Sequence, residues 1–340
     1  MRCIEDADVA RTEAVARNIR FPESYTDLCV NENPDEALMA TGIDPKTNKK
    51  HYRYASWHHI QKRYEKFRRM YHMLKDLPRI RMKIRELLAS SDETDRVHGM
   101  VLRLLDRCGL RPGNKDKYAS DGLSTLRPEH INISDSGIVT IKFMGKGNQL
   151  NTCRIVNDPT LVRTIYDLDT LSFKGVPVSF RKHIWPYQLK DFRTLGACRF
   201  FLNACLHSKH KFRKTAVQKA FGRTAKAFLN NTYKVARLNY IDRRLELGFV
   251  RGDFKMLKRR LKYLPRIPDM DRTEQLLLLF YETYGGENLA GWKESIRTRE
   301  KQLHRRFNLE RRRFNHTLGR KINHQHKGPH FESKTKRVKL

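Results

Sequence analysis

Four short segments of the sequence contain the residue types that can break a phosphodiester bond without a metal ion. The reaction needs a nucleophile that attacks phosphorus, cations that hold the non-bridging oxygens, and an acid that protonates the leaving oxygen. Arginine suits the second task because its planar guanidinium binds two oxygens at once and keeps its charge. Lysine suits the third task, and a tyrosine hydroxyl can serve as the nucleophile.

These groups follow one another in a defined order along the chain. The segments are LRPGNKDKY (110–118) with Arg111, IKFMGKGN (141–148) with Lys146, LKDFRTLGA (189–197) with Lys190 and Arg193, and LNNTYKVARLNYID (229–242) with Asn231 and Tyr240. Taken singly, each is weak evidence, because an arginine beside a glycine or a lysine in a turn is usually solvated surface. Tyr233, directly after LNNT, is the alternative nucleophile, and its other interpretation is core packing.

The elements before the first segment are predicted to be strands and then helices. The chain up to about Tyr54 reads as short strands and turns, with a hairpin over residues 37–54 around the turn formers of residues 44–48. From Trp57 to Leu74, apolar residues recur at helical spacing until Pro78 interrupts them. More helix is expected up to about residue 105, with Ser90 and Glu93 as a capping box.

The later segments are expected on a small sheet and on helices. Residues 129–156 favour three short strands, which place Lys146 at the tip of a hairpin. After about Gln188 the pattern is helical to roughly residue 325, and glycines near residue 285 separate a last basic helix, residues 292–322. Its apolar residues form one stripe, which predicts that the helix packs on the catalytic domain. Its arginines and the tail 334–340 could instead extend the contact with DNA.

Composition indicates a nucleic-acid partner. The 340 residues include 70 Lys and Arg against 37 Asp and Glu, a net charge of +33, which favours binding to a polyanion. No signal peptide or membrane-spanning run is expected, because the start is too charged and the longest apolar run is far too short. The six cysteines form no C-x-x-C pair, so reduced thiols in an intracellular protein are expected. Zinc-ligand spacing and a phosphate-binding G-x-x-x-x-G-K-[ST] loop are also absent, and no metal or cofactor is predicted.

The segments taken together resemble the type IB DNA topoisomerases of poxviruses, giant viruses and bacteria. The resemblance spans roughly residues 20–250. It rests on RPGNKDKY (111–118) followed by GLSTLR (122–127), KFMGK (142–146), KDFRT (190–194), LNNT (229–232) and the hairpin ATGIDPKTNKKHYRY (40–54). The chain departs from the poxviral pattern at Asn231, where those enzymes have His, and LNYIDRR (238–244) is more similar to the nuclear enzymes.

The resemblance implies a role for each residue. Tyr240 would form a 3′-phosphotyrosyl bond, Arg111 and Arg193 would clamp the scissile phosphate, and Asn231 would donate a hydrogen bond to it. Lys146 would be the general acid. Residues that would contact the DNA are Lys190, Lys49, Lys50, Tyr52, Tyr54 and Tyr118.

The fold class expected from the resemblance is α+β. A small β-rich DNA-clamp domain (1–76) would precede a mainly helical catalytic domain with a small antiparallel sheet (77–284), followed by a basic extension (285–340). The chain would act as a monomer that clamps duplex DNA and relaxes supercoils without ATP or metal. It would work inside the cell, in a nucleus or, if viral, in a viral factory or virion. The alternatives are a tyrosine recombinase, which usually has His where Lys190 stands, and a non-enzymatic basic DNA-packaging protein.

Overall fold

The structure is a computed structural model that describes residues 2–111, 121–145, 148–168, 180–209 and 213–284. The chain divides into two compact units, Met1–Leu289 and Ala290–Leu340. The expected C-terminal helix and tail lie outside the described residues, so the account below concerns the first unit.

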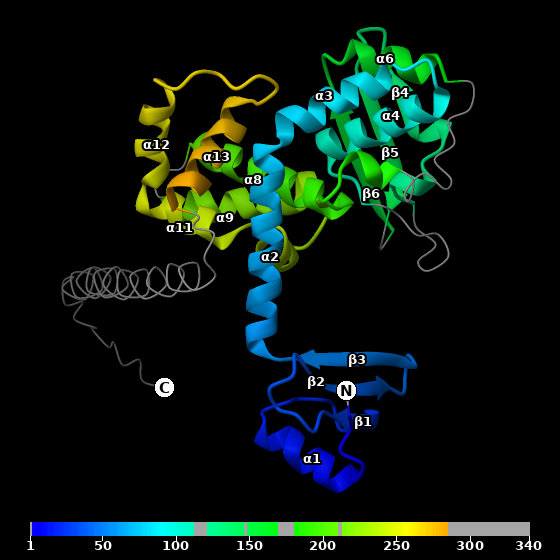
Figure 1. Ribbon diagram of the computed structural model, residues 1–340, viewed down its shortest axis with the longest axis vertical. Coiled ribbons are helices and arrows are strands. Elements are labelled where there is room, and N and C mark those ends of the chain that lie inside the picture. The colour runs from blue at the N-terminus through cyan, green and yellow to red at the C-terminus, as the bar shows by residue number, and fades with distance from the viewer. Residues whose placement is uncertain (1, 112–120, 146–147, 169–179, 210–212, 285–340) are drawn as a thin grey trace, which may run out of the picture. The chain divides into compact units, whose positions relative to one another are not determined.

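The N-terminal module is a three-stranded antiparallel sheet with one helix. Its elements are α1 (Ala7–Ala16), β1 (Thr26–Val30), β2 (Leu38–Asp44) and β3 (Lys49–Tyr54), with the strands in the order β1-β2-β3 (Figure 1). The predicted hairpin is confirmed by the pairing of β2 with β3. Helix α1 was not predicted, because the residues it buries, Ala10 and Ala14, give only a weak helical pattern. The Asp6 side chain caps it by accepting from the backbone N–H groups of Asp8 and Val9.

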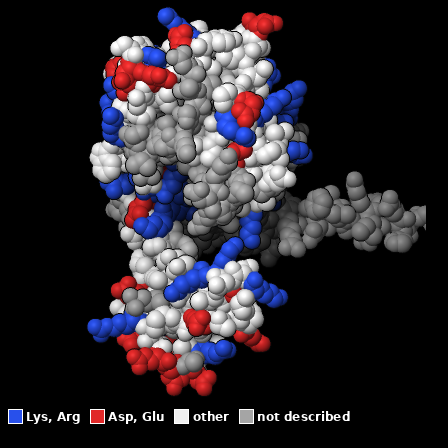
Figure 2. All heavy atoms as spheres, turned by 90° about the vertical axis from the view of Figure 1, so that its right-hand side faces the viewer, with Lys and Arg blue, Asp and Glu red and all other residues white. Residues whose placement is uncertain are grey.

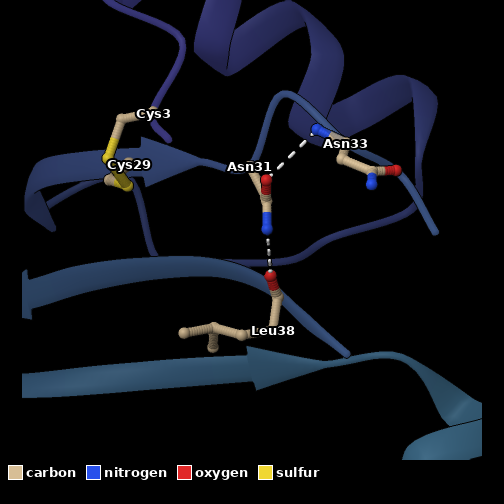
Figure 3. The surroundings of a disulfide bond; sticks show 5 residues. All are labelled: Cys3, Cys29, Asn31, Asn33 and Leu38. Atoms are coloured by element: carbon tan, nitrogen blue, oxygen red, sulfur yellow. Dashed lines mark hydrogen bonds between the residues drawn. A yellow bond between two sulfur atoms is a disulfide. The ribbon is translucent and has the colours of Figure 1, made fainter. Parts of the chain in front are cut away.

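A disulfide and an asparagine hold the edge of this module. Cys3 is bonded to Cys29 on β1 (Figure 3). Asn31 donates through Nδ2 to the carbonyl of Leu38 at 2.9 Å, and its Oδ1 accepts from the backbone N–H of Asn33 at 3.1 Å. The Asn31 side chain thereby fixes the loop that joins β1 to β2.

Three helices begin the second part of the first unit: α2 (Ser56–Lys75), α3 (Leu77–Leu88) and α4 (Glu93–Cys108). Phe67 and Leu74 of the predicted stripe on α2 are fully buried and Tyr71 is partly buried, whereas Trp57 is 42% exposed. Pro78 lies in the first turn of α3, so it ends one helix and begins the next. The expected capping box is wrong, because Asp92 caps α4 through the backbone N–H of Asp95.

A second small sheet follows, with β4 (Ile131–Ile133), β5 (Val139–Gly145) and β6 (Gln149–Ile155) in that order. The three predicted strands are confirmed, and the last described pair of the β5–β6 hairpin is Gly145 with Gln149. Short 3₁₀ helices, η1 (Leu123–Thr125) and η2 (Pro128–His130), precede the sheet.

Helices make up most of the remaining described chain, as predicted. They are α6 (Pro159–Tyr166), η3 (Phe180–His183), α8 (Leu189–Leu206), α9 (Arg213–Arg223), η4 (Thr224–Leu229), α10 (Tyr233–Asn239), α11 (Arg243–Arg251), α12 (Asp253–Leu261) and α13 (Arg272–Tyr284). Together with the two sheets they make the fold α+β, as expected. None of the helices in the described ranges has the length and apolar character needed to cross a membrane.

A buried ion cluster joins four of these helices. Arg81 on α3 pairs with Asp106 on α4 at 2.9 Å and with Glu274 on α13 at 2.7 Å, and Arg199 on α8 reaches Glu274 at 2.6 Å. Burial alone would raise the pKa of Glu274, but its bonds to Arg81 hold that pKa below the usual value. Removing one partner of such a cluster leaves a buried charge uncompensated, which is strongly destabilising. The charged pairs therefore keep these four helices together.

The cysteines correct one expectation. Cys108, the last residue of α4, is bonded to Cys153 on β6, so four of the six cysteines are in disulfides and not reduced thiols. Cys198 and Cys205 are free and buried, and burial raises the pKa of both thiols. The second disulfide ties the helix that precedes Arg111 to the hairpin that carries Lys146.

The disulfides make a direct prediction for thiol counts and stability. Protein unfolded without reductant should react with two equivalents of a thiol reagent, and reduced protein with six. The double variant Cys108→Ala/Cys153→Ala should lower the free energy of unfolding by about 2–4 kcal/mol, because it releases a closed loop in the unfolded chain. Cys205→Ala is the control, since it removes a buried thiol but no disulfide. Six reactive thiols in the unreduced protein would contradict both disulfides.

Candidate active site

Arg193 on α8 links three separate segments of the chain. Its side chain is almost completely buried, and its Nη1 donates to the carbonyl of Gly109 at 2.5 Å. Its Nη2 donates to the carbonyl of Leu229, the last residue of η4. One guanidinium therefore holds the end of α4 beside the end of η4, and these are the segments that lead to Arg111 and Asn231.

Arg111 and Asn231 meet directly. Nη2 of Arg111 donates to Oδ1 of Asn231 at 2.8 Å, although the two residues lie 120 positions apart in the sequence. Gly109 takes a left-handed conformation with φ of +55° to end α4, and this turn starts the segment that carries Arg111. On the other side, η4 is a π-helical turn, and the backbone N–H of Asn231 donates to the carbonyl of Ala225 at 2.9 Å.

Tyr240 lies at the end of α10 against Arg193. The Arg193 guanidinium carbon is 5.3 Å from the centre of the Tyr240 ring. Contacts on both sides fix the backbone here: the carbonyl of Tyr240 accepts from Sγ of Cys198 at 3.4 Å, and Nζ of Lys66 donates to the carbonyl of Asn239 at 2.8 Å. Burial lowers the pKa of Arg193, and the neighbouring Tyr240 hydroxyl partly offsets this by favouring the charged guanidinium.

Two donors in this group have no acceptor among the described residues. They are Nε of Arg193 and Nδ2 of Asn231, and both are buried. An unpaired buried donor is costly, especially on a charged group, so such a position favours an external acceptor. The arrangement can therefore bind an anionic oxygen beside the hydroxyl-bearing ring of Tyr240.

The β5–β6 hairpin closes the same group from another side. Gly145 and Asn151 line one small cavity together with Arg111 and Arg193. Nδ2 of Asn230 donates to the carbonyl of Leu150 at 2.9 Å, which joins the hairpin to the loop before Asn231. Lys146 follows Gly145 directly but lies outside the described residues, as does Tyr118.

Two comparisons with known proteins indicate the family of the chain. The family model described as the catalytic core of eukaryotic DNA topoisomerase I matches residues 54–162. The chain is also similar to DNA topoisomerase 1B of Acanthamoeba polyphaga mimivirus, with 30% identity over 257 residues, which cover 66% of this chain and 75% of the relative. The chain belongs to the type IB DNA topoisomerase family. It is thus an isomerase that acts on DNA, as the sequence motifs indicated.

The alternative nucleophile occupies a different environment in this topoisomerase. Tyr233 begins α10, and its ring packs edge-on against Phe221 with centres 5.5 Å apart. Burial raises the pKa of Tyr233, which disfavours a phenolate. Its ring contacts Phe221 but is 41% exposed, so Tyr233 is not a core residue, as the alternative interpretation had it.

Some contacts of the site have no signal in the sequence. Lys66 on α2 reaches Asn239 across 173 positions, and no motif around Lys66 predicts it. Arg69, one turn later on α2, pairs with the fully buried Asp191 at 3.3 Å. Lys190, predicted to contact DNA, is exposed in the first turn of α8. Its positive charge helps to lower the pKa of Lys66, although burial is the larger cause.

The expected DNA contacts of the N-terminal module are exposed on β3. Tyr52 and Tyr54 are 50% and 38% exposed, and their rings stack 6.4 Å apart. Lys49 and Lys50, at the start of the strand, are also exposed. Figure 2 shows one face of the molecule, with Lys and Arg side chains over both the N-terminal module and the helical part and a group of acidic side chains at the lower edge.

Close packing of glycine on Phe228 makes a second prediction. A Cβ added at Gly196 would lie 2.4 Å from Cζ of Phe228, and one at Gly109 would lie 2.6 Å from the same atom. Gly196→Ala should therefore displace Phe228 and, with it, the carbonyl of Leu229 and the side chain of Asn231. We expect single-turnover DNA cleavage to slow by at least about tenfold, since small misplacements of reacting groups are costly.

The second-site variant Phe228→Leu tests the cause. Combined with Gly196→Ala, it should recover part of the lost cleavage rate by giving the new methyl group space. Gly222→Ala is the matched control, because a Cβ there meets nothing within 4 Å. Equal cleavage by Gly196→Ala and the parent would show that this packing does not set the geometry of the site.

Proposed function

We propose that this chain relaxes supercoiled duplex DNA by breaking and rejoining one strand, with Tyr240 as the nucleophile and a 3′-phosphotyrosyl intermediate. The observation that carries the proposal is the position of the buried Arg193 guanidinium, 5.3 Å from the Tyr240 ring and with its Nε unpaired. It supports a site in which one cation serves both the nucleophile and the phosphate.

The first step is activation of the hydroxyl. A tyrosine phenol titrates near pH 10, so little phenolate forms at neutral pH without help. Arg193 would stabilise the negative charge that develops on the Tyr240 oxygen as it attacks phosphorus, because a cation nearby in a partly buried site interacts strongly with such a charge. The same contact raises the nucleophilicity of Tyr240 without a metal ion.

The second step is stabilisation of the charge that develops on the phosphate. Arg111, Arg193 and Asn231 can each donate to non-bridging oxygens, and the protein contacts of their backbone segments hold them in place before DNA arrives. Hydrogen-bond donors that are in position before the substrate binds make the largest contribution to the stabilisation of many transition states. Two arginines thus supply the positive charge that a metal ion provides in other phosphoryl-transfer enzymes.

The bond changes balance without an energy source. The Oη–phosphorus bond forms as the Tyr240 hydroxyl gives its proton to water, and the bond from phosphorus to the 5′-oxygen breaks. That oxygen takes a proton from a general acid, a role that the resemblance assigns to Lys146. The phosphotyrosyl ester retains the energy of the broken bond. After the free 5′ end has rotated, its hydroxyl attacks the ester and releases Tyr240, so ATP is not needed.

The DNA contacts are proposed to extend beyond the active site. Lys49, Lys50, Tyr52 and Tyr54 on β3, Lys190 on α8, and Tyr118 would bind the duplex backbone through charge and hydrogen bonds. One chain supplies every proposed catalytic group, which supports action as a monomer. Duplex DNA as substrate supports a location inside a cell, in the nucleus or a viral compartment.

Relaxation of a negatively supercoiled plasmid in EDTA, without ATP, tests this function. The parent should convert the plasmid to relaxed topoisomers, and Tyr240→Phe should show no activity while it keeps its affinity for duplex DNA. The loss follows from removing the oxygen atom that the proposal assigns as the nucleophile. DNA binding by electrophoretic shift and the unfolding midpoint check that the variant is folded.

Tyr233→Phe is the matched control, since it removes a hydroxyl seven residues away on the same helix and should leave relaxation unchanged. Activity in Tyr240→Phe, or its loss in Tyr233→Phe alone, would contradict the assignment. A recombinase would instead require a specific paired site, and a packaging protein would leave the plasmid supercoiled.

A further inference from the structure

Asp95, His98 and His183 form a cluster that none of the proposed catalytic steps uses. Their ligand atoms all lie within 4.8 Å of one another. Asp95 and His98 belong to α4, and His183 ends the 3₁₀ helix η3. Nε2 of His183 lies 3.3 Å from Nδ1 of His98, although the two residues are 85 positions apart.

The geometry suits a small cation. Asp95 and His98 are three positions apart on one helix, so their side chains share a face. Zinc–nitrogen bonds of about 2.0–2.1 Å place two nitrogens of a tetrahedral site roughly 3.3–3.4 Å apart. The separation of the two imidazole nitrogens matches that value, and His98, only 3% exposed, is held in place by its surroundings.

The surroundings of the cluster lower the pKa of both imidazoles. Burial lowers the pKa of His98, and Lys182 lowers it further, while Asp95 and Asp92 partly counteract both effects. For His183 the causes are burial, then His98, then Lys182.

We propose that Asp95, His98 and His183 bind one divalent transition-metal ion of the zinc class. Imidazole nitrogens favour zinc or cobalt over magnesium and calcium, which prefer oxygen ligands. The ion would tie η3 to α4. Because His183 lies only a few residues before α8, the ion would brace the start of the helix that carries Lys190 and Arg193. Its role is to stabilise the fold, and the proposed strand cleavage does not involve it.

Cobalt binding to the full-length protein tests the site. Protein stripped with EDTA and then freed of chelator should bind Co²⁺ with visible absorption that saturates at one equivalent. Zinc should displace the signal and magnesium should not. The unfolding midpoint should rise by at least about 2 °C with saturating zinc, because an ion that binds only the folded state stabilises it.

Variants separate this cluster from the other histidines, of which the sequence has 14. His183→Gln and the isosteric Asp95→Asn should each lower the affinity for the single Co²⁺ ion, read from the visible absorption, at least about tenfold. His207→Gln, which alters an exposed histidine on the last turn of α8, is the control and should leave the signal unchanged. Unaltered plasmid relaxation in EDTA would show that the variants are folded.

Two results would overturn the proposal. The first is a parent protein without a saturable cobalt signal, which would leave the imidazoles as a hydrogen-bonded pair. The second is a signal that persists in both Asp95→Asn and His183→Gln. Either result would leave the proposed relaxation activity intact, since that activity is measured in EDTA.

Discussion

The active site depends on one buried cation, the guanidinium of Arg193. Its two terminal nitrogens donate to carbonyl oxygens at the ends of α4 and η4, and its Nε has no acceptor among the described residues. Removing a charge from water is expensive, so the fold must compensate with fixed dipoles. Those dipoles are the carbonyls of Gly109 and Leu229, and the residues two positions after them are Arg111 and Asn231.

The same desolvation supports the catalytic role that we propose for the site. Electrostatic interactions strengthen as water is excluded, so Arg193 has more effect on Tyr240 than an exposed arginine would. The glycines at positions 109 and 196 allow Phe228 to pack closely against the end of α4 and against α8. The cluster around Arg81 and the Cys108–Cys153 disulfide hold the surrounding helices and hairpin so that these short distances persist.

Much of this arrangement could be predicted from the sequence, because it is specified by residues that are close together in the chain. Turn formers at residues 44–48 and glycines at 145 and 147 specify the two hairpins, and helical spacing specifies α2. The family motifs predicted the meeting of Arg111, Arg193, Asn231 and Tyr240, which the described structure brings together.

What the sequence did not predict comes from contacts between distant positions. Helix α1 buries only small side chains, so it gave little periodic signal. The Cys3–Cys29 and Cys108–Cys153 pairs have no C-x-x-C spacing, and they form because the fold brings strands and a helix end together. His98 and His183 likewise show no ligand motif, and Lys66 reaches the Tyr240 segment from a helix that the motifs do not include.

The identity of the covalently bonded residue tests the central claim most directly. A suicide duplex, in which the strand downstream of the cut is too short to be retained, would trap the covalent complex. Protease digestion and mass spectrometry would then locate the attached nucleotides. The account predicts a single modified residue, Tyr240, joined to the 3′ end of the cleaved strand. Attachment at Tyr233, or through a 5′-phosphate, would contradict it.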